Sequence, residues 1–278
     1  MTVLLTIFIF CIILILYLHV RFHLKVNNDL DVFVVDDFKR QRINEICNLK
    51  QPFMFRYLNQ ELIECMNFDS LLKSFKTNSL NVKKSKDTNY LPLKLENVFE
   101  LFEKDASNNY ISEHNMDFLN DTGVIKHFKN SNVLTPNLKS NSRFDCILGK
   151  KNYGTELRHN LFYRNFFYVS CGKIRVKMFS PNNANKISQG TQVEFCDFIH
   201  DEIPYEDPEK NMESLNQVEK VLNSGDIIFI PPYWFYSFYF EESSIINRFS
   251  YGTYMSNVSI LPVFCKHVLK LQNKKIKL

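Results

Sequence analysis

The sequence predicts a mainly β fold with accompanying helices, of the small antiparallel barrel type, preceded by one membrane helix. The first observation is a pair of short runs of β-branched and aromatic residues, 227–230 and 235–240, which have the composition of strands. The second is the link between them, Pro231-Pro232-Tyr233-Trp234, in which neither proline can donate a ladder hydrogen bond, so the sheet must bend there. The third is residues 2–20, which contain no Asp, Glu, Lys or Arg.

The N-terminal segment has the length and composition of a single membrane span. Nineteen uncharged residues at about 1.5 Å each match a hydrocarbon core of roughly 30 Å. A cleaved signal peptide is the main alternative, but it requires a basic start and a small-x-small cleavage site, which residues 20–25 do not supply. Arg21 and Lys25 follow the span, so the positive-inside tendency predicts a single-pass membrane protein whose soluble domain is cytoplasmic.

Composition excludes some classes of function. The net charge of +4 is a mild bias, and lysines occur in short pairs such as Lys83-Lys84 and Lys150-Lys151 without interleaved aromatic residues. This pattern is typical of solvated surface, and we predict no nucleic-acid partner. The seven cysteines show no CxxC spacing, which favours reduced thiols and argues against a structural zinc site.

We divide the chain into a membrane anchor at 1–22, a mixed N-terminal part at 23–150, and a β core with a C-terminal helix at 151–278. Period-two runs and turn signals predict strands at 30–35, 51–56, 162–170, 173–179, 218–222, 227–230, 235–240 and 244–254. Helical spacing predicts helices at about 36–48, 61–66, 70–75, 95–104, 125–128 and 260–274. We expect a hairpin turn at Cys171-Gly172, a loop at 76–90, and a long acidic insert at 181–215.

Two motifs carry a resemblance to a known family. The stretch Gly225-Asp-Ile-Ile-Phe-Ile-Pro-Pro-Tyr-Trp-Phe-Tyr236 is similar to the Gly-Asp-x-x-x-Ile-Pro-x-x-Trp-x-His segment of JmjC and cupin-like iron- and 2-oxoglutarate-dependent hydroxylases. Residues 154–165 resemble the segment of that family with Thr-x-x-His-x-Asp and a later Asn. The resemblance extends loosely over residues 30–270, and it implies a double-stranded β-helix, or jelly-roll, barrel. Single-span cupin-like proteins of this composition also resemble those coded by large DNA viruses.

The resemblance also implies where iron ligands would stand. In the family, His and Asp at positions i and i+2 share one face of a strand, and a later His completes a facial triad. Counting from Thr155 places Arg158 and Asn160 at the first two positions, whereas counting back from Asn165 places His159 and Leu161 there. Neither count gives His-x-Asp.

The remaining family positions are also changed. The position of the later His holds Tyr236, and the position of the family's 2-oxoglutarate-binding Lys holds Ile174. Arg175 and Lys177 stand next to Ile174, but an adjacent residue on a strand points to the opposite face. We therefore predict no catalytic residue, no metal ligand and no cofactor, and we name as pocket candidates Thr155, Arg158, His159, Asn160, Asn165, Trp234 and Tyr236.

The leading hypothesis is a catalytically degenerate JmjC or cupin-like protein that acts as a membrane-anchored binding or scaffold module, bound to the membrane through residues 2–20. The alternative is an active Fe(II)- and 2-oxoglutarate-dependent hydroxylase with an altered ligand set, in which His159 acts with a carboxylate from the substrate or from the insert. A third hypothesis is a small anionic ligand bound by Arg158.

Two further alternatives stay open. The side chain of Arg158 could instead point outward or pair with an acidic neighbour such as Glu156. The C-terminal helix could form a homodimer or pack against its own barrel, and the protein partner is not specified by the sequence.

Overall fold

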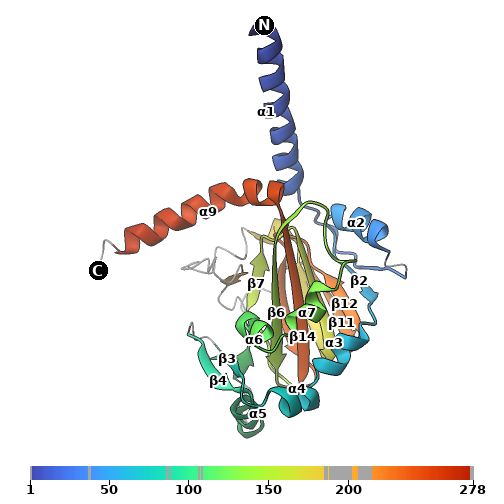
Figure 1. The fold of residues 1–278 in the computed structure, drawn as a ribbon, viewed down its shortest axis with the longest axis vertical. Coiled ribbons are helices and arrows are strands. Elements are labelled where there is room, and N and C mark those ends of the chain that lie inside the picture. Colours follow the sequence, from blue (N-terminus) through green and yellow to red (C-terminus); the bar gives the residue numbers. More distant parts are fainter. Residues whose placement is uncertain are drawn as a thin grey trace.

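Two β-sheets form the body of the protein, and a long N-terminal helix projects from it (Figure 1). The computed structural model describes residues 2–36, 39–85, 87, 89–105, 107, 109–184, 187, 202–205 and 215–275. The larger sheet has nine strands in the order β1-β2-β12-β8-β14-β6-β5-β3-β4, and the smaller has five in the order β10-β7-β13-β9-β11.

The strands and helices have the following bounds. The strands are β1 Phe33–Val34, β2 Phe53–Arg56, β3 Ser79–Lys84, β4 Leu91–Lys94, β5 Tyr110–Ser112, β6 Lys139–Gly149, β7 Leu157–Asn160, β8 Arg164–Cys171, β9 Lys173–Phe179, β10 Glu202–Tyr205, β11 Gln217–Asn223, β12 Asp226–Phe229, β13 Phe235–Phe240 and β14 Ser244–Thr253. The helices are α1 Thr2–Leu24, α2 Arg40–Asn48, α3 Gln60–Cys65, α4 Phe68–Phe75, α5 Leu95–Lys104, α6 Met116–Asp121, α7 Ile125–Lys129 and α9 Tyr254–Lys275.

The chain from β6 to β14 crosses repeatedly between the two sheets. Strands β6, β8, β12 and β14 lie together in the larger sheet, while β7, β9, β11 and β13 lie together in the smaller one. This alternation is the strand arrangement of a jelly roll, in agreement with the mixed, strand-rich fold that the sequence predicts. Closure of the two sheets into a barrel stays a prediction.

The main core has two layers, separated by the larger sheet. One layer lies between the two sheets; we call it the inner cluster, and it includes Phe167, Ile174, Trp234, Tyr236, Phe238 and Ile246. The other layer packs the opposite face of the larger sheet against the helices, through residues such as Leu62, Leu71, Phe128, Phe166 and Phe249. Each face of the larger sheet is covered by one of these layers. Its strands are therefore apolar on both faces.

The hairpin expected at Cys171-Gly172 is wrong. Strand β8 pairs with β12 and β14, whereas β9 pairs with β11 and β13, so the turn is a corner at which the chain changes sheet. Gly172 has φ of +81°, and a Cβ atom there would collide with the side chain of Ser244 and the backbone oxygen of Ser243. The glycine thus permits both the left-handed conformation and the close approach of the turn between β13 and β14.

Replacing Gly172 with alanine should destabilise the protein by about 2 kcal/mol, because a Cβ adds both left-handed strain and overpacking against backbone. Urea denaturation of the full-length chain in detergent, followed by the emission of its single Trp, measures this change. Gly154→Ala is the matched control, since the nearest atom to its Cβ is 3.8 Å away, and it should change stability by only a few tenths of a kcal/mol. Equal effects of the two substitutions would contradict the prediction.

Other differences from the expected elements concern length and position. The loop expected at 76–90 contains strand β3, and β6, the longest strand, was not predicted. The strand expected at 30–35 is reduced to Phe33–Val34, and the C-terminal helix begins at Tyr254 rather than at residue 260. Most of the acidic insert at 181–215 lies outside the described residues; within it lie the 3-10 turn at Pro181–Asn183 and β10.

Candidate functional site

Strand β7 divides the candidate residues between two faces of the smaller sheet. Arg158 is the register partner of Tyr236, which belongs to the inner cluster, and Asn160 is two residues further along, so both side chains face the inner cluster. His159 alternates to the other face, where its ring contacts Phe235 edge-on at 5.2 Å between centroids. The count from Thr155 therefore identifies the inward-facing positions, and His159 is not one of them.

Arg158 does not point outward, and its acidic partner is not Glu156. Its Nη1 donates to Oε2 of Glu113 at 2.7 Å. Lys83 Nζ lies 3.3 Å from the other oxygen of Glu113 and 3.2 Å from Glu156, while the Tyr90 hydroxyl donates to Glu113 at 2.7 Å. We call Lys83, Tyr90, Glu113, Glu156 and Arg158 the buried charge cluster.

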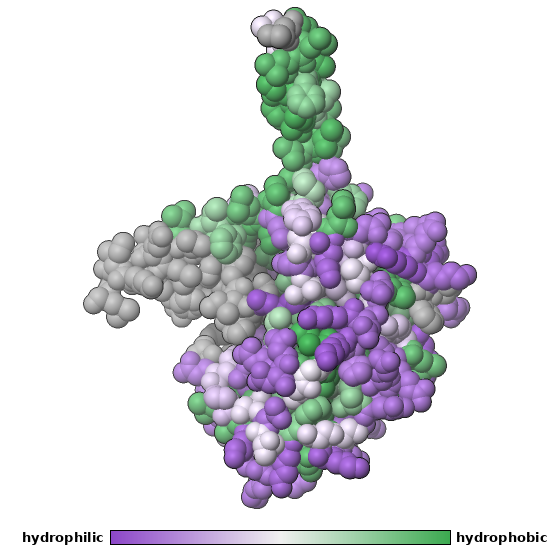
Figure 2. All heavy atoms as spheres, in the orientation of Figure 1, coloured by the Kyte–Doolittle hydropathy of each residue, from purple (hydrophilic) through white to green (hydrophobic). Residues whose placement is uncertain are grey.

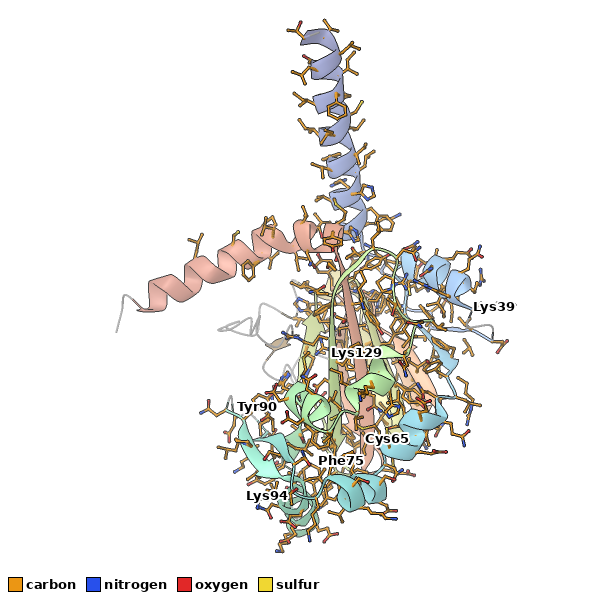
Figure 3. The ribbon with its side chains drawn as sticks, in the orientation of Figure 1. Lys39, Cys65, Phe75, Tyr90, Lys94 and Lys129 are labelled. Atoms are coloured by element: carbon orange, nitrogen blue, oxygen red, sulfur yellow. The ribbon has the colours of Figure 1, made fainter. Side chains whose placement is uncertain are left out.

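The buried charge cluster joins three separate parts of the chain. Lys83 comes from β3, Glu113 follows β5, and Arg158 lies on β7; Tyr90, in the turn between β3 and β4, is marked in Figure 3. Glu113 is 1% exposed, and burial alone would raise its pKa, but the charges of Arg158 and Lys83 hold the pKa well below its ordinary value. Lys83 is 8% exposed, so the prediction that the Lys83-Lys84 pair is solvated surface is wrong for Lys83.

The backbone next to Glu113 is fixed by a buried aspartate. Both oxygens of Asp145 on β6 accept backbone N–H bonds, from His114 at 2.9 Å and from Asn115 at 2.6 Å. The side-chain amide of Asn115 in turn donates to Ser112 and to the Cys146 carbonyl. Glu113 is thus presented to Arg158 by a turn whose neighbouring donors are satisfied.

A second polar group forms a chain of hydrogen bonds across the interior. The Asn160 amide donates to the Tyr236 hydroxyl at 3.4 Å, and the Asn165 amide donates to Asn160 Oδ1. The Ser250 hydroxyl donates to Asn165 Oδ1 at 3.0 Å, and Arg248 Nε donates to Ser250 at 2.9 Å. All five residues are buried, so this hydrogen-bonded chain is part of the packed interior.

The remaining candidates make structural contacts. The Thr155 hydroxyl accepts the backbone N–H of Phe238 at 2.8 Å and so extends the pairing of the smaller sheet. The Trp234 indole N–H donates to the Asn27 carbonyl at 3.0 Å, which ties the core to the segment after α1. Ile174 lies in the inner cluster, and its neighbour Arg175 pairs with Glu241 on the other face, as strand alternation predicts.

The inward-facing donors do not fit an iron site of the facial-triad type. Iron in such sites is held by two imidazoles and one carboxylate, whereas these positions supply the cationic Arg158, the neutral amide of Asn160 and the phenol of Tyr236. The guanidinium cannot act as a ligand because it remains protonated in proteins. Among the described residues, no three His, Cys, Asp or Glu side chains are grouped so that they could hold a metal ion.

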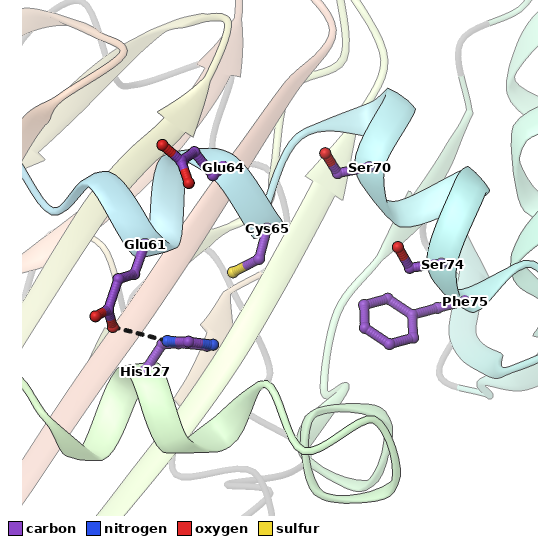
Figure 4. Close-up of a pocket in the computed structure, with 7 residues that line it drawn as sticks. All are labelled: Glu61, Glu64, Cys65, Ser70, Ser74, Phe75 and His127. Atoms are coloured by element: carbon purple, nitrogen blue, oxygen red, sulfur yellow. Dashed lines mark hydrogen bonds and ion pairs between the residues drawn. The ribbon is translucent and has the colours of Figure 1, made fainter.

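A surface pocket lies elsewhere, between the helices that cover the larger sheet. It has a volume of about 350 Å³ and is lined by Glu61, Glu64, Cys65, Ser70, Ser74, Phe75 and His127 (Figure 4). Glu61 Oε2 and His127 Nδ1 are hydrogen-bonded at 2.8 Å in this pocket. Burial raises the pKa of the Cys65 thiol to about 11, so this thiol stays protonated at neutral pH and is a poor nucleophile.

The sequence could not identify Lys83, Glu113 and Arg248 as interior residues. The residues adjacent to each of them in the sequence give no sign of burial. The contacts that bury them come from positions far apart in the chain. The apolar residues Leu80 and Val82, both buried on β3, stand two positions apart in the sequence. This period-two pattern would have indicated a strand near Lys83.

A family model described as a cupin-like domain matches residues 27–249. The match therefore covers both sheets from β1 to all but the end of β14, and it leaves out all of α1 and all of α9. A search of curated proteins found no match to the chain.

Proposed function

Since the chain belongs to the cupin-like domain family, we propose that it is a membrane-anchored cupin-like module that binds or scaffolds a partner without iron-dependent hydroxylation. The observation that carries this proposal is the occupancy of the inward-facing positions. Arg158 is bound to Glu113, and Asn160 and Tyr236 are bound to each other, where the family resemblance implies iron ligands.

The packing of the interior supports a scaffold over an oxygenase. The inner cluster fills the space around Asn160 and Tyr236 with large buried side chains, including Phe167 at 5.1 Å from the Tyr236 ring and Phe238 at 5.5 Å. Arg158 is also held by a carboxylate, so an incoming anion would have to displace Glu113 from a site that is almost fully buried. This contact disfavours the hypothesis of a small anionic ligand at Arg158.

Helix α1 supports the anchor. It has 23 residues, is long and apolar enough to cross a membrane, and contains no buried residue in its most apolar window. Figures 1 and 2 show it standing clear of the sheets with an apolar surface around it. Such a helix would expose its Leu, Ile and Phe side chains to water unless lipid covers them, which favours a bilayer as its environment.

The junction between α1 and the domain is held by Lys50. Its ammonium donates to the carbonyls of Phe22, His23 and Lys25 at 2.6, 2.9 and 3.0 Å, and so satisfies the C-terminal end of the helix. Burial, with a smaller contribution from Lys25, lowers the pKa of Lys50 to about 8, which leaves the amine mostly protonated at pH 7. The anchor is thereby joined to the domain through a fixed contact.

Metal content and 2-oxoglutarate turnover test the proposed function. The full-length chain, purified anaerobically in detergent with Fe(II) supplied, should retain far less than one equivalent of iron and should convert no 2-oxoglutarate above the buffer control. Stoichiometric iron coupled to 2-oxoglutarate turnover would refute the proposal. Loss of that iron in His159→Ala would then identify the altered ligand set of the alternative hypothesis.

The anchor and its orientation need a separate measurement. We expect the chain to remain in the membrane fraction after alkaline carbonate extraction, because α1 is held by its apolar length rather than by surface charge. The positive-inside tendency places the domain on the cytoplasmic side, so protease added outside intact cells should leave it uncut. Digestion under these conditions would reverse the proposed orientation, and release by carbonate would reject the anchor.

A further inference from the structure

Helix α9 leaves the domain after one buried turn and then projects into solvent. Ser256 and Ser259 are buried, and Thr253 and Ser256 exchange hydrogen bonds that fix the start of the helix. From Val258 onward, large apolar side chains of α9 are 39–60% exposed, namely Val258, Leu261, Val263, Phe264 and Leu269. Exposed apolar residues gathered on one projecting helix indicate a surface that another phase or molecule covers.

The position of α9 relates this surface to α1. The two helices contact each other, and α9 runs across the domain end of α1 rather than along it (Figure 1). Figure 2 shows the apolar surface of α1 continuing onto the first half of α9. A 23-residue helix is roughly 35 Å long, so if α1 spans a hydrocarbon core of roughly 30 Å, its last turn lies at the headgroup level, where α9 begins.

The junction at Lys50 makes this placement specific. Three carbonyls at the end of α1 are held by one buried side chain, and the next segment is held by the Trp234 bond to Asn27 and by the Gln51 bond to Asp31. With the domain held against α1 in this way, the height of α9 relative to the membrane is set by the fold.

The charged residues of α9 and of the segment after it are all basic. Residues 254–278 contain five lysines and no acidic residue, and all five lysines follow Cys265. An apolar first half followed by a basic second half suits the boundary between acyl chains and anionic headgroups, where each basic residue adds attraction. A second copy of the chain would bring like charges together, so the charge favours lipid over self-association.

We propose that α9 lies on the surface of the bilayer that α1 crosses, with its exposed apolar residues in the headgroup boundary and its lysine-rich end on anionic lipid. The inference rests on the proposed membrane anchor. It makes the cupin-like domain a two-point membrane protein, in which α1 supplies the attachment and α9 fixes how the domain faces the membrane.

Cys265 is a native probe for this contact, because it is exposed on α9. The full-length chain carrying C11A, C65A, C171A and C196A would be labelled at Cys265 with an environment-sensitive nitrobenzoxadiazole fluorophore; Cys47 and Cys146 are buried. The labelled chain is placed in nanodiscs at one copy per disc, of phosphatidylcholine with or without phosphatidylserine. We expect quenching by doxyl-labelled lipid to exceed quenching by aqueous iodide several-fold, and phosphatidylserine to increase the difference.

A substitution pair separates lipid contact from other causes. Leu261→Glu should move the probe into water, with a red shift and a gain of iodide quenching. Leu72→Glu on α4 is the matched control, since Leu72 is also exposed but α4 lies at the end of the domain opposite α1, and it should leave the probe unchanged (Figure 1). An equal response to both substitutions would overturn the proposal.

The same sample distinguishes failure of the inference from failure of the anchor. Loss of the chain from the membrane in alkaline carbonate would reject the anchor and, with it, the inference. A chain that resists extraction while its Cys265 probe is quenched only by iodide would overturn the inference and leave the anchor intact. Shielding of the probe in discs with two copies but not in discs with one would assign the surface to a second copy, and would equally overturn it.

Discussion

Replacing Glu113 with glutamine is expected to destabilise the folded domain by about 3–5 kcal/mol, the usual cost of breaking a buried ion pair from one side. The substitution leaves the buried Arg158 without the carboxylate at 2.7 Å, and within the described part of the chain it leaves Lys83 paired with the partly exposed Glu156. The measurement is urea denaturation of the full-length chain in detergent, followed by the emission of Trp234, which is fully buried in the native state.

Glu61→Gln is the matched control for this prediction. The Glu61 carboxylate also contacts a basic side chain, His127, at 2.8 Å, but the Glu61 side chain is 64% exposed, so loss of this contact should cost less than about 1 kcal/mol. If Glu113→Gln costs no more than this control, Arg158 does not depend on Glu113, and the hypothesis of an anion bound by Arg158 regains support.

The complete removal of the cluster's inner charges gives the opposite expectation. A variant carrying K83M, E113L and R158M removes the three inner charges of the cluster together, and apolar replacements of buried ion pairs are often neutral or stabilising. This variant should therefore be more stable than Glu113→Gln alone. A partner or ligand that binds through the cluster would be lost in the triple variant, although the fold is retained, so binding assays on it separate a structural role from a binding role.

Local composition predicted the strands next to the corners, where the chain passes from one sheet to the other, well. Residues 235–240 and 173–179 coincide with β13 and β9, because alternating apolar residues and strong turn signals bound each run. Tyr236 lies just beyond the bend, as predicted, because the two prolines before Trp234 interrupt the strand and so mark the corner in the sequence. Local composition does not identify which strands pair with each other. The wrong hairpin at Gly172 is an example, because the pairing there depends on which sheet the chain enters after the corner.

The parts that the sequence missed depend on distant contacts. Strand β6 begins with Lys139-Ser-Asn-Ser-Arg, a run of low strand propensity that becomes a strand through its pairing with β14. The buried charge cluster is equally non-local, since its members at 83, 113 and 158 meet only after three strands have assembled. A lysine in such a cluster cannot be distinguished in the sequence from one on the surface, because burial and not residue type separates them.

His159 should make the domain sensitive to mild acid. Burial lowers the pKa of His159 to about 4, whereas the same side chain in the unfolded chain titrates near 6.5. Between pH 6.5 and 4 the unfolded state binds a proton at this position that the folded state does not, so the contribution of His159 to stability falls as the pH falls through this window, by about 3 kcal/mol in total. Above pH 6.5 the contribution of His159 is constant.

The free energy of unfolding of wild type and of His159→Gln, measured from pH 7 to pH 5, tests this expectation. The free energy of unfolding of the wild type minus that of the glutamine variant should decrease as the pH falls from 7 to 5, because only the wild type has this imidazole. Staying above pH 5 also avoids the window in which Glu113 begins to contribute, because that carboxyl is ionised in both states until the pH approaches 4.5. A difference that does not change with pH would mean that the pKa of His159 is the same in the folded and the unfolded protein.

The same pH titration, repeated in the presence of Fe(II), tests whether His159 binds a metal. A metal bound through His159 would stabilise the neutral imidazole in the folded state, raise the free energy of unfolding with metal concentration, and lose this effect in His159→Gln. The ring instead lies beside Phe235, on the face of β7 opposite Asn160 and Arg158. We therefore expect Fe(II) to leave the stability of the wild type unchanged at every pH, and a metal-dependent rise confined to chains that contain His159 would restore the hydroxylase alternative.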